Sequence, residues 1–335
     1  MNSLPSRWRG PLLLGAAGMA AAFLYVQARK AQVERQHPPA GKFVEVDGVR
    51  LHYLEQGQGP TVVLLHGNGV TADDFALSGV LDALSERYHV IAFDRPGFGY
   101  SERPGGTSWT PEVQARLFYQ ALHQLRVERP IVLGHSWGTL VALAMALEFP
   151  RYVRGITLVG GYYYPGPRLD AVLGGLPALP VLGQLWRYTL APLLGRLMWP
   201  RLAQHMFAPA PVPQRFDALP PWMALRPAQL GASAQEAASM VPAAARLAKR
   251  YRELTLPVSL IAGEGDRIID PGQHSRQLHR ELGHSDLRMQ QGTGHMAHYG
   301  HAAEIMAAVD RVSAEAAGSI APPTAAAASE APTLH

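Results

Sequence analysis

The sequence contains no cysteine among its 335 residues. This absence excludes disulfide bonds, a thiol nucleophile and thiolate metal sites, although it does not fix the compartment in which the protein works. A large excess of either charge is also absent, because 30 basic and 26 acidic residues leave a net charge of only +4. A balance this weak argues against nucleic-acid binding. If the chain carries out nucleophilic catalysis, the attacking group is therefore something other than a thiol.

A long hydrophobic run is missing as well. The clearest apolar stretch runs from Leu12 to Val26. It is shorter than the roughly 20 residues that a membrane-spanning helix usually needs. Its length matches the longest apolar cores of signal peptides. Arg29 and Lys30 directly follow a conceivable cleavage site, which argues against cleavage. We favour a membrane anchor and linker in residues 1–40 over export after signal cleavage, with a buried core helix as a third alternative. Basic residues flank both sides, so the side of the membrane stays open.

Between the two ends, strand-like and helix-like segments alternate along the chain. The strand-like segments are a hairpin around Asp47-Gly48 (residues 42–46 and 49–54) and the runs 61–65, 90–93, 131–133, 153–159, 258–262 and 287–289. The helix-like segments are residues 78–87, 111–125, 137–149, 271–282 and 302–312. Such alternation predicts an α/β fold in which a mostly parallel sheet is covered by helices on both faces.

The alternation breaks between Gly161 and about Leu230. This stretch holds 12 of the 28 prolines, 9 of the 27 aromatic residues and six arginines against two acids. We interpret residues 161–230 as an insertion that divides the core into residues 41–160 and 231–313. The small-residue tail 314–335 contains prolines and cannot bury enough apolar surface to order itself, so we expect it to be disordered.

One short motif carries a specific chemical signal: Gly-His-Ser-Trp-Gly at residues 134–138. It matches the G-x-S-x-G nucleophile elbow, in which serine occupies a strained turn between a strand and a helix. A strand-like run, 131–133, precedes the motif and a helix-like segment, 137–149, follows it. The helix N-terminus places positive partial charge beneath the serine oxygen. This context favours Ser136 as a nucleophile over an ordinary serine helix cap.

A serine hydroxyl needs a general base, and the base needs an acid that orients it. His295 follows the last strand-like run within Gly-Thr-Gly-His and is the candidate base. Asp266 follows the preceding strand-like run within Gly-Glu-Gly-Asp and is the candidate acid. Two competitors are weaker, because Glu264 comes too early after the strand and Asp270, beside a proline, resembles a helix cap.

The tetrahedral intermediate of acyl transfer carries an oxyanion that needs hydrogen-bond donors. One predicted donor is the backbone N–H of Trp137, directly after the nucleophile. The second is expected in the loop His-Gly-Asn-Gly at residues 66–69, which follows the strand-like run 61–65 and whose glycines allow a sharp turn. Asn68 is the donor we expect there, with a plain strand-ending turn as the alternative.

Two further histidines, His298 and His301, follow His295 at three-residue spacing, which is compatible with metal ligation. No thiolate is available to join them, and the preceding Gly-Thr-Gly favours a catalytic loop. We therefore expect no metal and no other cofactor.

Five motifs follow one another along the chain. They are His-Gly-Asn-Gly at 66–69, Asp-Arg-Pro-Gly-Phe-Gly-Tyr-Ser at 94–101, Gly-His-Ser-Trp-Gly at 134–138, Gly-Glu-Gly-Asp at 263–266 and Gly-Thr-Gly-His at 292–295. With these motifs and the chain order serine, aspartate, histidine, residues 42–312 resemble the α/β-hydrolase superfamily. The resemblance implies an α/β-hydrolase fold, a cap or lid formed by the insertion, and activity similar to a serine esterase or lipase. It also implies that residues 94–101 are a structural turn in a pocket wall.

The motifs are also similar to those of haloalkane dehalogenases and epoxide hydrolases. Dehalogenases commonly hold halide with the residue types found here as Asn68 and Trp137, but both groups attack with aspartate. A serine attacking an alkyl carbon would form a stable ether, whereas a serine attacking an acyl carbon forms an ester that water can open. Ser136 therefore favours acyl chemistry.

The insertion is apolar, aromatic and arginine-rich, and together with the expected membrane anchor it favours a small-molecule or lipid-like ester substrate. Amide or peptide hydrolysis and C–C bond hydrolysis are alternatives that use the same three residues. The elbow resembles that of proline iminopeptidases, but the His-Gly-Gly-Pro-Gly loop of that group is absent. A non-catalytic binding protein of the same fold is the alternative from a different functional class.

Overall fold

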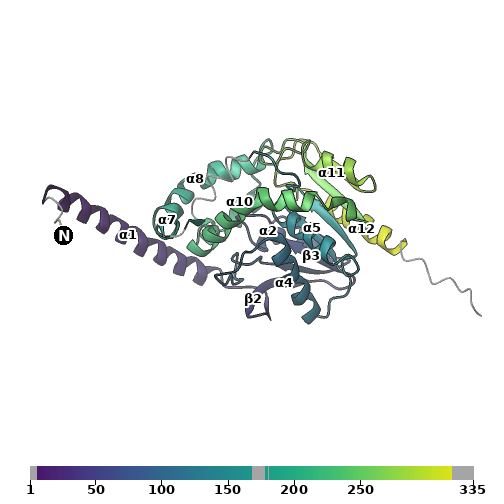
Figure 1. Cartoon of the computed structure of the whole chain (residues 1–335), viewed down its shortest axis with the longest axis horizontal. Coiled ribbons are helices and arrows are strands. Elements are labelled where there is room, and N and C mark those ends of the chain that lie inside the picture. The colour runs from purple at the N-terminus through teal and green to yellow at the C-terminus, as the bar shows by residue number, and fades with distance from the viewer. Residues whose placement is uncertain (1–5, 168–177, 180, 319–335) are drawn as a thin grey trace, which may run out of the picture.

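The computed structural model describes residues 6–167, 178–179 and 181–318 (Figure 1). Its centre is an eight-stranded sheet in the order β1-β2-β4-β3-β5-β6-β7-β8. The strands are β1 (Lys42–Val46), β2 (Val49–Gln56), β3 (Thr61–Leu65), β4 (His89–Phe93), β5 (Ile131–His135), β6 (Gly155–Val159), β7 (Val258–Gly263) and β8 (Asp286–Gln290). β1 and β2 are antiparallel to their neighbours, whereas β3 to β8 run parallel. The predicted fold and the predicted hairpin at Asp47-Gly48 are confirmed.

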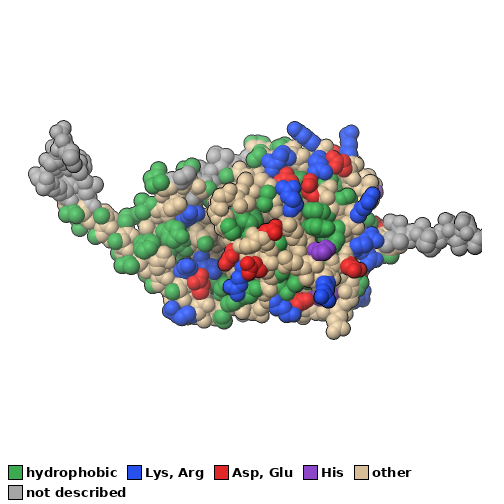
Figure 2. Space-filling model, turned by 60° about the horizontal axis from the view of Figure 1, so that its bottom comes forward, with side chains coloured by type: hydrophobic (Ala, Val, Ile, Leu, Met, Phe, Trp, Pro, Cys, Tyr) green, Lys and Arg blue, Asp and Glu red, His purple; other side chains and the backbone are tan. Residues whose placement is uncertain are grey.

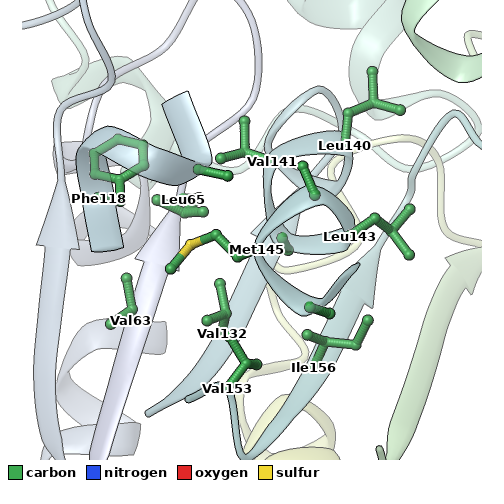
Figure 3. Close-up of a cluster of buried hydrophobic side chains, with 14 of the residues drawn as sticks. Val63, Leu65, Phe118, Val132, Leu140, Val141, Leu143, Met145, Val153 and Ile156 are labelled. Atoms are coloured by element: carbon green, nitrogen blue, oxygen red, sulfur yellow. The ribbon is translucent and has the colours of Figure 1, made fainter. Parts of the chain in front are cut away.

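Helices cover both faces of this sheet, and β3 illustrates why. Val63 and Leu65 point to one side and pack with α4 (Pro111–Gln124) and α5 (Gly138–Glu148). The alternate residues of the strand face the opposite side, where α2 (Asp73–Leu77), α3 (Val80–Ser85) and α12 (Ala302–Gly318) cover them. Figure 3 shows side chains from β3, β5, α4 and α5 packed in the first of these clusters. A strand buried on both faces needs the continuous apolar sequence that β3 has.

The insertion between β6 and β7 forms a helical cap. Its described elements are α7 (Leu182–Tyr188), α8 (Leu190–Phe207), the 3₁₀ turn η2 (Gln214–Ala218), α9 (Pro221–Ala224), α10 (Pro227–Ala248) and the 3₁₀ turn η3 (Tyr251–Glu253). After β7, α11 (Ser275–Leu282) lies beside β7 and β8. Figure 1 shows the cap helices on one side of the sheet, with α10 passing above α5.

The predicted end of the cap at residue 230 falls inside α10, which runs unbroken to Ala248. The insertion therefore includes the whole of this helix. The predicted start of the disordered tail also needs correction, because α12 continues to Gly318 and buries Val312 and Ala316. The rest of the tail lies outside the described residues.

The N-terminal helix α1 (Ser6–Gln36) is longer than the apolar run within it. Its C-terminal part packs on the cap, where Val33 is buried with Trp222 and Glu34 forms an ion pair with Arg226 at 3.1 Å. Figure 1 shows the rest of α1 extending from the body. Among the described residues, no helix combines the length and the apolar character needed to cross a membrane.

Exposed large hydrophobic side chains gather on α1 and on residues 179–202 of the cap. They include Phe23 and Leu24 of α1 and Leu185 and Trp186 of α7. Figure 2 shows hydrophobic side chains along α1 and the adjoining part of the body. Contiguous exposed apolar surface of this kind is typical of an interaction site.

Candidate active site

Ser136 occupies a sharp turn between β5 and α5. Its φ of +51° lies in the left-handed region, which a residue with a side chain rarely adopts and which costs free energy. The backbone N–H of Ser136 donates to the Val159 carbonyl of β6 at 2.8 Å, which holds the turn in place. A side chain at Gly138 would collide with the Leu65 carbonyl of β3, so glycine is required there. The strained turn expected of a nucleophile elbow is present.

The structure brings the three predicted catalytic residues together. His295 Nε2 lies 2.8 Å from Ser136 Oγ, and His295 Nδ1 lies 2.8 Å from Asp266 Oδ2. The three side chains follow β5, β7 and β8, whose carboxyl ends meet at one edge of the parallel sheet. The geometry is that of a nucleophile, a base and an orienting acid in hydrogen-bonded sequence. Their catalytic roles stay a prediction that this geometry supports.

The other two acidic candidates lie in different surroundings. Asp270 accepts a hydrogen bond from the Gln273 backbone N–H at 2.8 Å, as expected of a cap before α11. Glu264 is exposed and lies 3.7 Å from Arg276. Asp266 is therefore the acid that contacts the candidate base.

The environment of Asp266 favours its charged form. Burial opposes ionisation, but it is outweighed by the charge and hydrogen bond of His295 and by the backbone N–H groups of Ile268 and Ile269, so the pKa of this carboxyl is lowered. An ionised Asp266 accepts the Nδ1–H of His295 and so leaves Nε2 unprotonated, facing the serine. This tautomer is the one that a general base needs.

The loop proposed to supply the second oxyanion donor lies against the nucleophile. A Cβ at Gly67 would lie 3.1 Å from the Cβ of Ser136. The backbone N–H groups of Asn68 and Trp137 donate no hydrogen bond within the described part of the chain. Unpartnered backbone N–H groups close to a nucleophile are what an oxyanion hole requires. Both residues remain predicted donors.

A buried cluster of Asp74, His135 and His298 has ligand atoms close enough together to hold a metal ion. Both oxygens of Asp74 are already engaged, one with His298 Nε2 at 2.7 Å and one with the Tyr299 hydroxyl at 2.8 Å. His301 lies apart from this cluster, with its Nε2 3.0 Å from Thr293 Oγ1. Within the cluster, a hydrogen bond joins Asp74 and His298, and the buried Nδ1 atoms of His135 and His298 have no hydrogen-bond partner in the described part of the chain.

The turn at residues 94–101 has a structural role. Asp94 is buried and accepts hydrogen bonds from His52, from the Ala72 N–H and from the Tyr100 N–H at 2.7 to 2.9 Å. Burial opposes its ionisation, but His52 and the backbone donor outweigh burial and lower the pKa of this carboxyl. The turn thereby ties β2, β4 and the segment before α2 together, in agreement with the interpretation from the sequence.

His66 is a fully buried, neutral histidine at the start of the oxyanion loop. Its Nε2 accepts the backbone N–H of Arg95 at 2.9 Å, so its Nδ1 carries the proton and donates to the Gly67 carbonyl at 2.7 Å. Burial, reinforced by the Arg95 charge, lowers the pKa of His66 from 6.5 to about 3. The folded protein therefore resists protonation of this ring at a pH where the unfolded chain takes up a proton.

This difference predicts a pH dependence of stability. As pH falls from 6.5 towards 3, His66 binds a proton in the unfolded chain only, so the free energy of unfolding decreases. In the variant His66→Asn the slope of unfolding free energy against pH should be shallower, by up to about 1.4 kcal/mol per pH unit. Urea denaturation between pH 7 and pH 4 measures the slope. The exposed-site variant His123→Asn serves as control, and equal slopes in wild type and His66→Asn would refute this origin.

Sequence reasoning missed a buried polar group behind the oxyanion loop. Arg95 and Glu236 form an ion pair whose side chains are both inaccessible to solvent. Gln114 also donates to Glu236 at 3.1 Å, and the Trp137 indole N–H donates to the Glu236 carbonyl at 3.2 Å. The sequence offered one weak signal for this group: Glu236 is the single acid among the mostly small residues of α10.

Comparison with known proteins identifies the family of this chain. A family model described as alpha/beta hydrolase fold matches residues 60–302, more than half of the chain. The chain belongs to the α/β-hydrolase fold family. The resemblance drawn from the five sequence motifs is thereby confirmed.

Relatives in this α/β-hydrolase family differ in chemistry. Haloalkane dehalogenase 2 of Mycobacterium tuberculosis is 31% identical over 133 residues, which cover 40% of this chain and 46% of that protein. The 2-hydroxy-6-oxo-2,4-heptadienoate hydrolase of Pseudomonas putida is 32% identical over 152 residues, which cover 44% and 55%. The chain thus matches about half the length of each of these relatives.

A solved structure matches over a larger share of the chain. The crystal structure of a membrane phospholipase A has a TM-score of 0.63 at 24% identity and covers 91% of this chain and 97% of its own. At this identity the likeness shows that the two chains share the fold.

Proposed function

We propose that this hydrolase cleaves a carboxylic ester through an acyl-enzyme intermediate. The observation that carries the proposal is the hydrogen-bonded sequence Ser136–His295–Asp266 with 2.8 Å at each contact. Ser136 Oγ attacks the ester carbonyl carbon while His295 Nε2 takes its proton. The oxyanion accepts hydrogen bonds from the N–H groups of Asn68 and Trp137. His295 then protonates the departing alcohol, and water, activated by the same histidine, releases the acid.

Dehalogenase activity is a poor candidate, although one relative is named a haloalkane dehalogenase. Displacing halide from an alkyl carbon with Ser136 would leave an ether that water does not hydrolyse. An aspartate nucleophile avoids this outcome by forming an ester, and this chain has serine at that position.

We further propose a lipophilic substrate and attachment to a membrane through residues 12–26, on a side that the chain leaves open. Exposed apolar side chains on α1 and residues 179–202 support a lipid-facing surface, and one structural neighbour is named a membrane phospholipase A. Export after signal cleavage is the alternative. Sedimentation with membranes that survives a high-salt wash would support attachment, and recovery of the whole chain in the soluble fraction would contradict it.

Lipophilic preference predicts a dependence on acyl length. Across p-nitrophenyl esters from acetate to octanoate, kcat/KM should rise at least about tenfold, because each buried methylene contributes up to about 0.8 kcal/mol. Release of p-nitrophenol measures the rates. A preference for acetate would remove the lipophilic part of the proposal, and no hydrolysis of any ester would remove ester hydrolysis itself.

C–C bond hydrolysis is the second candidate. Two relatives, named 2-hydroxy-6-oxo-2,4-heptadienoate hydrolase and 2-hydroxymuconate semialdehyde hydrolase, are 32% identical over 152 residues, and one structural neighbour is named a meta-cleavage product hydrolase. The same serine would attack a ketone carbonyl, and a carbanion would leave in place of an alcohol. The substrate named for the Pseudomonas putida relative separates the two functions, since its conjugated dienoate absorbs light and its cleavage is followed directly. A kcat/KM for this compound above that of the best ester would favour the second candidate. Octanoyl p-nitroanilide tests amide cleavage in the same way, and inertness towards all three classes would favour a binding protein.

A further inference from the structure

One face of the cap helix α10 contacts both residues proposed to form the oxyanion hole. The Asn68 side-chain amide donates to the Ser233 carbonyl at 3.1 Å, and the Ser233 hydroxyl donates back to Asn68 Oδ1 at 2.5 Å. The Trp137 indole N–H donates to the Glu236 carbonyl at 3.2 Å. Ser233 and Glu236 are three residues apart in a helix and therefore share a face. The cap thus holds the side chain of each proposed donor residue.

A buried arginine links the same face of α10 to the backbone of the oxyanion loop. Arg95 donates from Nε to the His66 carbonyl at 2.7 Å and from Nη2 to the Gly67 carbonyl at 3.0 Å. Its remaining terminal nitrogen donates to the Glu236 carboxylate. Arg95 therefore fixes the peptide group that carries the Asn68 N–H and the peptide group before it. The counter-charge of this arginine, Glu236, lies on the cap.

These contacts matter because donors in an oxyanion hole act through their exact placement. Misplacement of a reacting or stabilising group by about 1 Å can cost about a hundredfold in rate. Within the described part of the chain, the hydrogen bonds of the Asn68 side chain all go to Ser233. If α10 moved away, this amide and the Trp137 indole would lose their partners, and both donor peptides would gain freedom.

We propose that Ser233 and Glu236 are positioning residues of the oxyanion hole. Through them, the position of the cap helix α10 determines how well the two donors stabilise the transition state. The inference rests on the proposed ester hydrolysis. A substrate that seats the cap firmly would thereby also order the two donors, so specificity and rate would be set by the same helix.

The test uses the full chain and p-nitrophenyl octanoate. Ser233→Ala should lower kcat about tenfold, less than removal of a whole donor, with KM within about twofold and an unchanged melting temperature. Ser233→Thr keeps the hydroxyl and should restore most of the rate. Gln235→Ala is the matched control, because Gln235 lies on the same helix but is exposed and bonds Arg103 at 2.9 Å. Its kcat should equal that of the wild type.

Two further readouts separate positioning from general damage. Affinity for a trifluoromethyl ketone, which forms an oxyanion on the enzyme, should fall about tenfold in Ser233→Ala, while affinity for octanol should stay constant. Asn68→Ala keeps the backbone donor but removes both bonds to Ser233, so adding Ser233→Ala to it should lower kcat no further. Trp137→Phe removes the separate hydrogen bond to the Glu236 carbonyl. Added to Ser233→Ala, it should lower kcat further.

The possible failures are distinguishable. A wild-type protein that hydrolyses no ester would overturn the proposed function. An active wild type whose kcat and ketone affinity are unchanged by Ser233→Ala and Asn68→Ala would overturn only the positioning role. Equal losses in Ser233→Ala and Gln235→Ala, together with lower melting temperatures, would also overturn it, because they would indicate general destabilisation of α10.

Discussion

Replacing Ser136 with alanine should abolish ester hydrolysis, lowering kcat by roughly 10⁵- to 10⁶-fold. The hydroxyl is the group that attacks, and its contact with His295 at 2.8 Å is the bond through which its proton leaves. The residual activity is slow direct hydrolysis by water, assisted by the oxyanion hole and by substrate binding. Initial rates with p-nitrophenyl octanoate measure the loss.

The protein should stay folded in this variant. The backbone turn at residue 136 is held by the Val159 carbonyl and not by the hydroxyl, so circular dichroism and the melting temperature should be unchanged. Ser108→Ala, at an exposed serine, should retain the full rate. A folded Ser136→Ala variant that works within tenfold of the wild type would be incompatible with serine catalysis.

Replacing Asp266 with asparagine should lower kcat about 10⁴-fold with little change in KM. The carboxylate accepts the Nδ1–H of His295, and its lowered pKa keeps it charged at neutral pH. An asparagine can turn an N–H towards Nδ1, which moves the ring proton to Nε2 and leaves the serine without a base.

The matched control for this variant is Asp270→Asn. Asp270 caps the turn before α11 through the Gln273 N–H, and the asparagine oxygen can accept the same bond. Its kcat should therefore equal that of the wild type. If Asp270→Asn lost activity while Asp266→Asn kept it, the acid would have been assigned wrongly.

The parts of the fold that were predictable depend on short-range signals. Asp47-Gly48 predicted the β1–β2 hairpin because it supplies turn residues with positive φ. The continuous apolar run at residues 61–65 predicted a strand covered on both faces, and the elbow predicted the turn around Ser136. The triad could be proposed because each of its members follows a strand, and parallel strands end at the same edge of the sheet.

The cap was less predictable because its contacts are long-range. Asn68 and Ser233 are 165 residues apart in the chain, and nothing near either residue indicates the other. Residue 230 was a plausible boundary since prolines and aromatics become sparse there, yet helix formers continue the same helix to Ala248. For the same reason α1 extends past Val26, where alanine, glutamine and charged residues prolong the helix beyond the apolar run.

The most direct test of the central claim is reaction of the intact wild-type protein with a fluorophosphonate, followed by mass spectrometry of its peptides. Serine catalysis predicts one phosphonyl adduct, on the peptide that contains Ser136, with labelling strongly slowed in Asp266→Asn. Folded wild-type protein with no adduct, or with the adduct on a different serine, would contradict the claim.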